Sequence, residues 1–245
     1  MKGWVRILAG CLVVVMALGA GTAQAAIIDI VADDAGQYSS DGWHEVDNEN
    51  YQTGEDTDEY RFASRSFFIF TIPTLTDPLV SAQLLAYNPL NGYSSPDASE
   101  TFQAADVSTS LGDLDADHAP GSASGQAIWA DLGAASYGSV VVTANDDGSY
   151  VTVALGGTAL TDIATAAGGQ MAIGGSLTTL SGTSQTGYEE RIFGWSTGWP
   201  FSDTPPRLVL TTRSGEPPPP VIPEPATFAL LGGALLGLAR RRRRK

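Results

Sequence analysis

Hydrophobic and polar residues alternate in short runs along most of the chain, and residues that favour turns separate the runs. The densest apolar run covers residues 61–72, is rich in phenylalanine and ends at Pro73. Short apolar or alternating runs bounded by Gly, Pro, Asn and Asp are typical of β-strands. Strands are also predicted over residues 27–31, 43–46, 79–87, 101–107, 137–143, 149–155, 170–180, 191–196 and 207–212.

Two local signals refine this pattern. Residues 145–148, Asn-Asp-Asp-Gly, stand between two predicted strands and are typical of a hairpin turn. Residues 158–167 have helical spacing, with Thr158 as the expected cap, Leu160 and Ile163 on one face, and a glycine after the last turn. We therefore expect an all-β fold, an antiparallel β-sandwich of the jelly-roll type with one short helix.

The N-terminal end has the pattern of a secretory signal peptide. A basic start and an apolar run of about 14 residues, too short to span a bilayer, precede Ala23 and Ala25 at the spacing of a signal-peptidase site. We predict that residues 1–25 are removed and that the mature chain begins at Ala26. Cys11 is the only cysteine, so this mature chain has none for a disulfide or a thiolate metal site.

The C-terminal end combines four features in a fixed order. Residues 214–222 form a proline-rich linker, which is stiff and extended. Pro223, Glu224 and Pro225 come next, and an apolar segment and six consecutive cations close the chain. About 19 residues, from 221 to 239, are enough for a helix across a thin bilayer, with the basic cluster on the cytoplasmic side.

This order of features resembles the sorting signal of the PEP-CTERM proteins of Gram-negative bacteria, here over residues 223–245. The resemblance implies export through the inner membrane by the secretion machinery, a transient single-pass intermediate, and recognition by a membrane-embedded exosortase that cuts near Pro-Glu-Pro. It also implies a final location at the cell surface or in the extracellular matrix, usually in organisms that make exopolysaccharide and biofilms. A permanent single-pass anchor remains the alternative.

Between these two signals, residues 26–213 form the predicted β-sandwich ectodomain. Residues 26–222 contain five arginines against 26 acidic residues. Phosphate backbones repel a body of this charge, which excludes nucleic acid as a partner. An anionic polysaccharide would be repelled as well, so the charge favours a neutral glycan.

The order of elements in the ectodomain is similar to that of the DNRLRE-type jelly-roll modules, which are related to carbohydrate-binding modules. The similarity rests on the phenylalanine-rich strand that ends in Ile72-Pro73, on the short helix, and on the closing strand that begins at Pro206. It implies the jelly-roll fold and a role in binding extracellular polysaccharide.

The sequence predicts no catalytic residue. Ser196 stands in a Gly-x-Ser-x-Gly pattern, but the prolines that follow forbid the helix of a nucleophile elbow, and no histidine comes later in the chain. Acidic residues are so numerous that no pair is singled out for glycoside hydrolysis. We therefore expect a protein that is not an enzyme.

A candidate metal site comes from Asp113, Asp115 and Asp117, which alternate as carboxylates do in calcium loops. His118 stands where an EF-hand needs glycine, so the EF-hand is excluded. Two interpretations stay open, a looser structural Ca²⁺ site and a solvated acidic loop, and the loop is favoured because charge runs usually stay hydrated. No other cofactor is predicted.

The candidate ligand-binding residues are aromatic. Trp199 directly precedes Pro200 in a predicted loop, and an exposed indole there can stack on a sugar ring. Trp43 is the second candidate, and packing in the core is the alternative for both. His44, next to Trp43, is interpreted as a structural histidine because no partner is evident in the sequence.

Together these features predict an exported, surface-sorted, non-enzymatic protein that binds or scaffolds glycan in the extracellular polysaccharide matrix. Two alternatives remain. The first is a matrix-processing glycosidase or lyase, and the second is a structural adhesion or coat protein with no small ligand.

Overall fold

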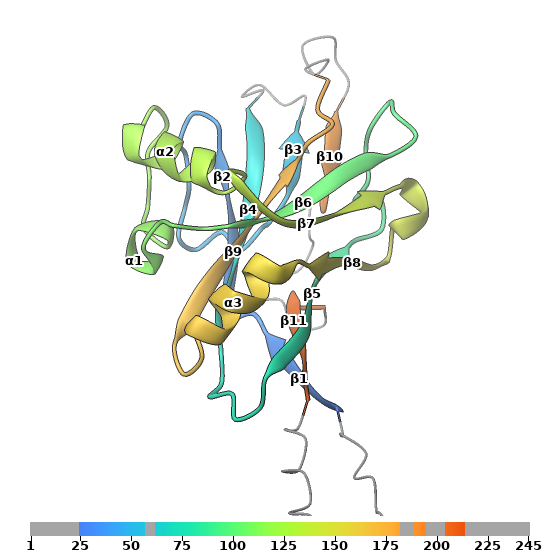
Figure 1. The fold of residues 1–245 in the computed structure, drawn as a ribbon. Helices are drawn as coiled ribbons and strands as arrows, with labels where there is room; N and C mark the ends of the chain where they lie inside the picture. Colours follow the sequence, from blue (N-terminus) through green and yellow to red (C-terminus); the bar gives the residue numbers. More distant parts are fainter. Residues whose placement is uncertain (1–24, 57–61, 182–188, 195–203, 214–245) are drawn as a thin grey trace, which may run out of the picture. The chain divides into compact units, whose positions relative to one another are not determined.

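The strands form two antiparallel sheets that face each other in the computed structural model, which describes residues 25–56, 62–181, 189–194 and 204–213 (Figure 1). Sheet A contains four strands, in the order β1 (Ala25–Val31), β11 (Arg207–Arg213), β5 (Leu79–Asn88) and β8 (Ser149–Leu155). Sheet B contains β10 (Glu190–Ile192), β3 (Thr53–Glu55), β4 (Ala63–Thr71), β9 (Gln170–Leu177), β6 (Glu100–Asp106) and β7 (Ala135–Val142), with β2 (Asp34–Ser39) paired to β4. The predicted β-sandwich is confirmed.

The main core lies between the two sheets. Sheet A contributes every second residue of its strands, such as Leu84, Val153 and Leu208. Sheet B contributes Phe68 and Phe102, whose rings are fully buried. Each large apolar side chain of this kind stabilises the fold by about 1.5–3 kcal/mol through burial, so the alternating pattern of the sequence translates directly into sheet packing.

A second core lies on the outer face of sheet B, under two helices that the sequence did not predict. The helices are α1 (Leu111–Leu114) and α2 (Ala123–Asp131), and serine side chains at 110 and 122 cap them. Their apolar residues are few and have no strong helical spacing, which is why the prediction of a single helix was wrong. The buried residues of this second core are Tyr38, Phe67, Ile69, Leu114, Ile128, Leu132 and Ala172.

The predicted helix is present as α3 (Gly157–Thr165). Its N-cap is Gly156, which has no side chain to bond the first turn, so the predicted threonine cap was wrong. Ala159 and Ile163 are buried in the main core. Gly168, with φ +83°, ends the segment and donates its N–H to the carbonyl of Ile72 at 2.9 Å.

The predicted hairpin around residues 145–148 is a crossover instead. The strands on both sides exist, but β7 pairs with β6 in sheet B and β8 pairs with β5 in sheet A. A capping box between Thr143 and Asp146 forms a 3₁₀ turn, η1 (Ala144–Asp146), which carries the chain from one sheet to the other. β7 therefore belongs to sheet B and β8 to sheet A, and both strands contribute buried residues, such as Tyr137 and Val153, to the core between the sheets.

The first and last described strands of the chain are neighbours in sheet A. Ala25 of β1 pairs with Arg213 of β11, and the ladder continues to Val31 and Arg207. The predicted strand over residues 43–46 is only an isolated bridge at His44, while β2 and β3 were not predicted.

The part of the chain between Gln24 and Ser214 forms one compact unit. Among the described residues, no helix combines the length and the apolar character that crossing a bilayer requires. The predicted signal peptide up to residue 24, and the linker and sorting segment from residue 214 onward, lie outside the described residues.

Candidate functional site

The structure describes some of the residues that the sequence singles out and not others. Those described are Trp43, Asp113, Asp115 and Asp117, together with Ala25 and Ala26, which begin β1. Those outside the described residues are Ala23, Trp199, Pro223, Glu224 and Pro225. The predicted roles of this second group stay predictions.

Two of the candidate segments, far apart in sequence, lie side by side. The backbone N–H of His44 donates to the carbonyl of His118 at 3.0 Å, and the reverse bond measures 2.9 Å. The backbone N–H of Val46 donates to the Asp117 carboxylate at 2.9 Å. The loop with Trp43 and the acidic segment therefore form one surface region, which sequence reasoning had treated as two separate candidates.

The three carboxylates of the acidic segment face different partners. Asp113 accepts from the hydroxyl of Ser110 at 2.7 Å, Asp117 faces Val46, and Asp115 is hydrogen-bonded to the Asp34 carboxyl. Within the ranges that the structure describes, no group of three His, Cys, Asp or Glu side chains is arranged to hold a metal ion. The calcium site stays a prediction, without support from this geometry.

Asp34 is the residue of this region that sequence reasoning missed. Its burial, and then the hydrogen bond with Asp115, raise its pKa from 3.8 to about 7. The two carboxyl groups of glycosidases stand about 5–9.5 Å apart so that a sugar or a water molecule fits between them. A carboxyl pair in direct hydrogen-bond contact does not have this spacing.

His44 is a core histidine. Its side chain is 3% exposed, stacks on the Tyr38 ring at 4.5 Å and donates through Nδ1 to the carbonyl of Gln37 at 3.0 Å. Burial lowers its pKa. Gly36 makes room for it, because a Cβ at that position would lie 2.6 Å from Phe67 and 3.1 Å from His44. This position agrees with the structural interpretation of the histidine.

The two tryptophans that the structure describes differ in their surroundings. Trp129 packs under the guanidinium of Arg65, 3.9 Å from the ring centre, and its Nε1 donates to the carbonyl of Ala63 at 2.9 Å. Trp43 is half-buried, and its backbone N–H donates to the side chains of Ser39 and Asp41. Trp43 is therefore less enclosed than the core aromatics such as Tyr38, which is fully buried.

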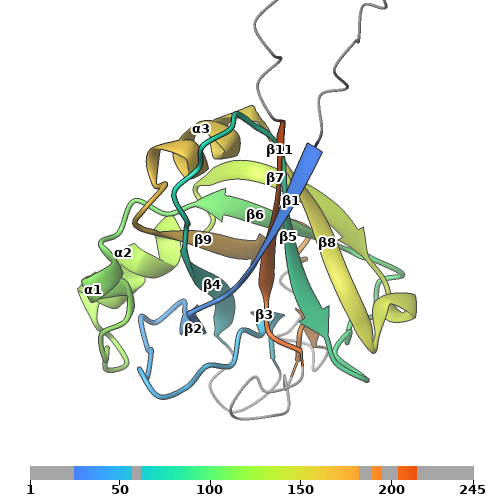
Figure 2. The ribbon, with the colours of Figure 1, turned by 90° about the horizontal axis from the view of Figure 1, so that it is seen from below.

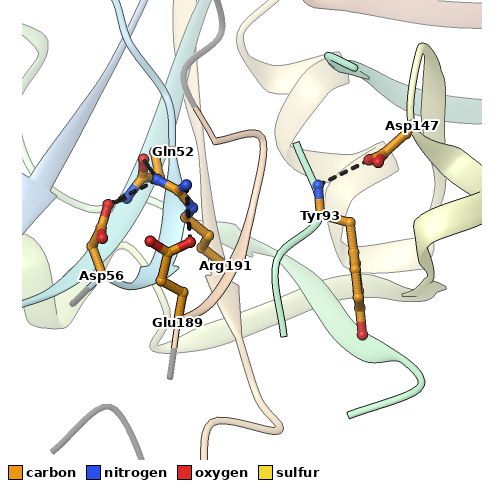
Figure 3. Close-up of polar contacts among 6 residues, drawn as sticks. All are labelled: Gln52, Asp56, Tyr93, Asp147, Glu189 and Arg191. Atoms are coloured by element: carbon orange, nitrogen blue, oxygen red, sulfur yellow. Dashed lines mark hydrogen bonds and ion pairs between the residues drawn. The ribbon is translucent and has the colours of Figure 1, made fainter. Parts of the chain in front are cut away.

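A polar network surrounds Arg191 at the β3–β10 edge of sheet B (Figure 3). Its guanidinium donates to Asp56 at 2.8 Å, to Glu189 at 3.0 Å and to the amide oxygen of Gln52 at 3.2 Å. Arg191 is 8% exposed, and its Nε is buried without a hydrogen-bond partner. Two carboxylates around one buried cation join the short strands β3 and β10 at their ends.

A second polar contact in the same view holds the turn after β5. The Asp147 carboxylate accepts from the backbone N–H of Tyr93 at 2.9 Å and from the amide of Asn88 at 2.8 Å (Figure 3). Asn88 is fully buried and also accepts from the N–H of Phe193. Neither network was predicted. The signal available for the first network was Arg191, which follows Glu189 and Glu190 at the start of a predicted strand. The second gave no separate signal, because Asp147 was interpreted as part of a hairpin turn.

Comparison with known proteins identifies one segment of the chain. Residues 221–244 match the family model of the PEP-CTERM protein-sorting motif. No curated protein matches the chain. The predicted resemblance of the C-terminal end is confirmed, and the match leaves the role of the sandwich itself to be inferred from its surface.

Proposed function

We propose that this protein, which carries a PEP-CTERM sorting motif, is a non-enzymatic component of the extracellular polysaccharide matrix and binds or scaffolds glycan through its β-sandwich. The motif belongs to secreted proteins that an exosortase processes at the membrane and that are displayed on the cell surface. This is the observation that carries the proposal, because a domain displayed there is surrounded by the polysaccharide that the cell secretes.

The described residues support binding more than catalysis. His44 is packed in the second core, and His118 is hydrogen-bonded to a carbonyl and to serine hydroxyls. The Asp34–Asp115 pair is too close for the two-carboxylate mechanism. A half-exposed indole at Trp43, and the predicted platform at Trp199, offer flat apolar rings to sugar faces instead.

The sorting step has a direct test. We expect the mature surface protein to lack residues 240–245, because the exosortase removes the tail near Pro-Glu-Pro. Replacing Glu224 should leave the tail uncut and the protein held in the inner membrane. Mass spectrometry of the surface protein reads its C-terminus, and recovery of an intact Lys245 would contradict exosortase processing.

The binding step is tested on the exopolysaccharide of the producing strain. The mature protein should be retained by it and release neither new reducing ends nor unsaturated uronates. Trp199→Ala should weaken retention by about 1–3 kcal/mol with little change in Tm, as aromatic anchors do elsewhere. Product release would favour the glycosidase or lyase alternative, and absence of retention would favour the coat protein.

A further inference from the structure

The outer face of sheet A is open to solvent. No described helix packs on it, since α1 and α2 cover sheet B and α3 packs on the main core through Ala159 and Ile163 (Figure 2). Its outward side chains include the apolar Ile27, Val31, Val209 and Leu85, and the smaller Ser81, Gln83, Thr152 and Ala154 are exposed. Four strands at about 4.8 Å spacing make this face about 14 Å across, enough surface for an oligosaccharide.

A tyrosine pair stands at one end of this face. Tyr87 of β5 and Tyr150 of β8 are directly opposite each other in the ladder, and their ring centres are 5.4 Å apart at 69°. Both rings are half-buried, and the Tyr150 hydroxyl donates to the carbonyl of Pro205 at 3.1 Å. Edge-to-face packing is a favoured arrangement of two aromatic rings, so each ring holds the other in a fixed orientation.

The two charged side chains that join β1 and β11 on this face balance each other. Arg207 of β11 donates to both carboxylate oxygens of Asp29 on β1, at 2.9 and 2.5 Å. This bidentate pair neutralises itself. Its ladder neighbours, Leu85 and Val209, are apolar, and Thr152 and Gln83, which pair with those two residues, are polar without charge. Since the body of the protein is strongly acidic, an uncharged hydroxylated ligand matches this face better than a polyanion does.

From this arrangement we infer that the outer face of sheet A is a glycan-binding surface for a neutral polysaccharide, with Tyr87 and Tyr150 as the stacking platform. The inference rests on the proposed function and locates it on the molecule. Gln83 and Thr152 supply hydrogen bonds to sugar hydroxyls, and Asp29 holds Arg207 in position as a further donor. The rings and the ion pair are held before binding, which reduces the ordering cost of association.

The test compares variants of the full mature protein on the neutral and the uronate-containing fractions of the producing strain's exopolysaccharide. Wild-type protein should be retained by the neutral fraction at low and at high salt alike. Tyr87→Ala and Tyr150→Ala should each weaken retention about tenfold or more. Gln83→Ala, an exposed change that keeps the packing, should weaken it less. Tyr93→Ala, a half-buried tyrosine outside this face, is the matched control and should bind as wild type does.

The outcomes separate this inference from the proposed function. If wild-type protein is retained but the two tyrosine variants and Gln83→Ala bind equally well, the surface lies elsewhere while the function stands. Retention by the uronate fraction alone would overturn the neutral ligand. If wild-type protein is retained by neither fraction, the proposed function fails and this inference fails with it. Thermal melts of each variant exclude unfolding as the cause of lost binding.

Discussion

The outer faces of the two sheets differ in whether helices cover them. The outer face of sheet B is covered by α1 and α2, and Phe67 and Ile69 of β4 are buried against Leu114, Ile128 and Leu132. No described helix covers the outer face of sheet A, and Ile27 of β1 is 73% exposed there. One sheet is thus buried on both sides, while the other has one side in the core and one in water.

The hydrophobic patterns of the strands account for this difference. Phe67, Phe68, Ile69 and Phe70 of β4 are all buried, in a continuous apolar run. In β5, buried and exposed residues alternate. A continuous run needs cover on both faces, whereas alternation needs it on one. The continuous apolar run of β4 therefore needs elements that cover the outer face of sheet B, and the short helices α1 and α2 cover it.

The largest expected effect tests whether the helices form a true core on sheet B. Phe67→Ala should lower the free energy of unfolding by about 3–5 kcal/mol, because the ring is fully buried and its removal leaves a cavity. Leu85→Ala, on the outward side of β5, is the control and should cost about 1 kcal/mol or less. Urea unfolding measures both. Equal costs would mean that the two outer faces do not differ as described.

The contact between α2 and sheet B can be tested at a glycine. A Cβ on Gly174 of β9 would lie 2.5 Å from the carbonyl oxygen of Leu132, the residue that ends α2. Gly174→Ala should therefore destabilise the protein by about 1–3 kcal/mol. Gly157→Ala, in the first turn of α3 with open space around it, should be neutral or stabilising. Thermal melts that rank these two variants in the opposite order would contradict a close approach of α2 to β9.

The covered face also holds a titrating group. Because the folded protein raises the pKa of Asp34 from 3.8 to about 7, it binds more protons than the unfolded chain between these values. Stability from this group is therefore highest in acid and falls as the pH rises from about 4 to about 7. Asp34→Asn should remove that decline. Tm measured across this range reads the effect, and parallel profiles for wild type and variant would show that Asp34 has an ordinary pKa.

The open face should respond weakly to loss of its ion pair. The side chains of Arg207 and Asp29 are 36% and 42% exposed. Water screens such a pair, so Asp29→Asn should change the free energy of unfolding by about 1 kcal/mol or less. A loss comparable to that of Phe67→Ala, measured in urea, would mean that the pair is shielded by something bound to sheet A.

Calcium should have the smallest effect of all. The three aspartates of the acidic segment face different partners, so a millimolar addition of Ca²⁺ is expected to leave Tm unchanged. A ligand that binds only the folded state raises Tm by mass action. A rise with Ca²⁺ and not with Mg²⁺ would establish the site that the alternation of Asp113, Asp115 and Asp117 predicts.

Most strands were predictable because their signals are local. The turn residues and apolar positions placed β1, β4, β5, β6, β9 and β11 close to their observed bounds. The helix α1 was missed because Asp113 to Asp117 were interpreted as a calcium loop or an acidic loop, and α2 was missed because its apolar residues have no strong helical spacing. The pairing of β7 and β8 was also wrong, because a tight turn does not say whether the next strand stays in the same sheet.

The candidate sites were predictable only as separate residues. Trp43, His44 and the acidic segment were each noted, but their contact through His44 and His118 joins positions far apart in the chain. Asp34 and Arg191 gave weaker signals still. Their properties depend on burial and on the partners that folding brings to them.

By itself, the sequence determined the sorting tail, the acidic charge and the β class, because each is a property of residue order or composition. The tertiary structure alone decided which face of each sheet is covered, where the chain crosses between sheets, and that Tyr87 meets Tyr150 on an open surface. The physical reason is that burial and contact are set by segments distant in the chain. A local pattern shows which faces of a strand must be buried, and only the fold shows which distant segments bury them.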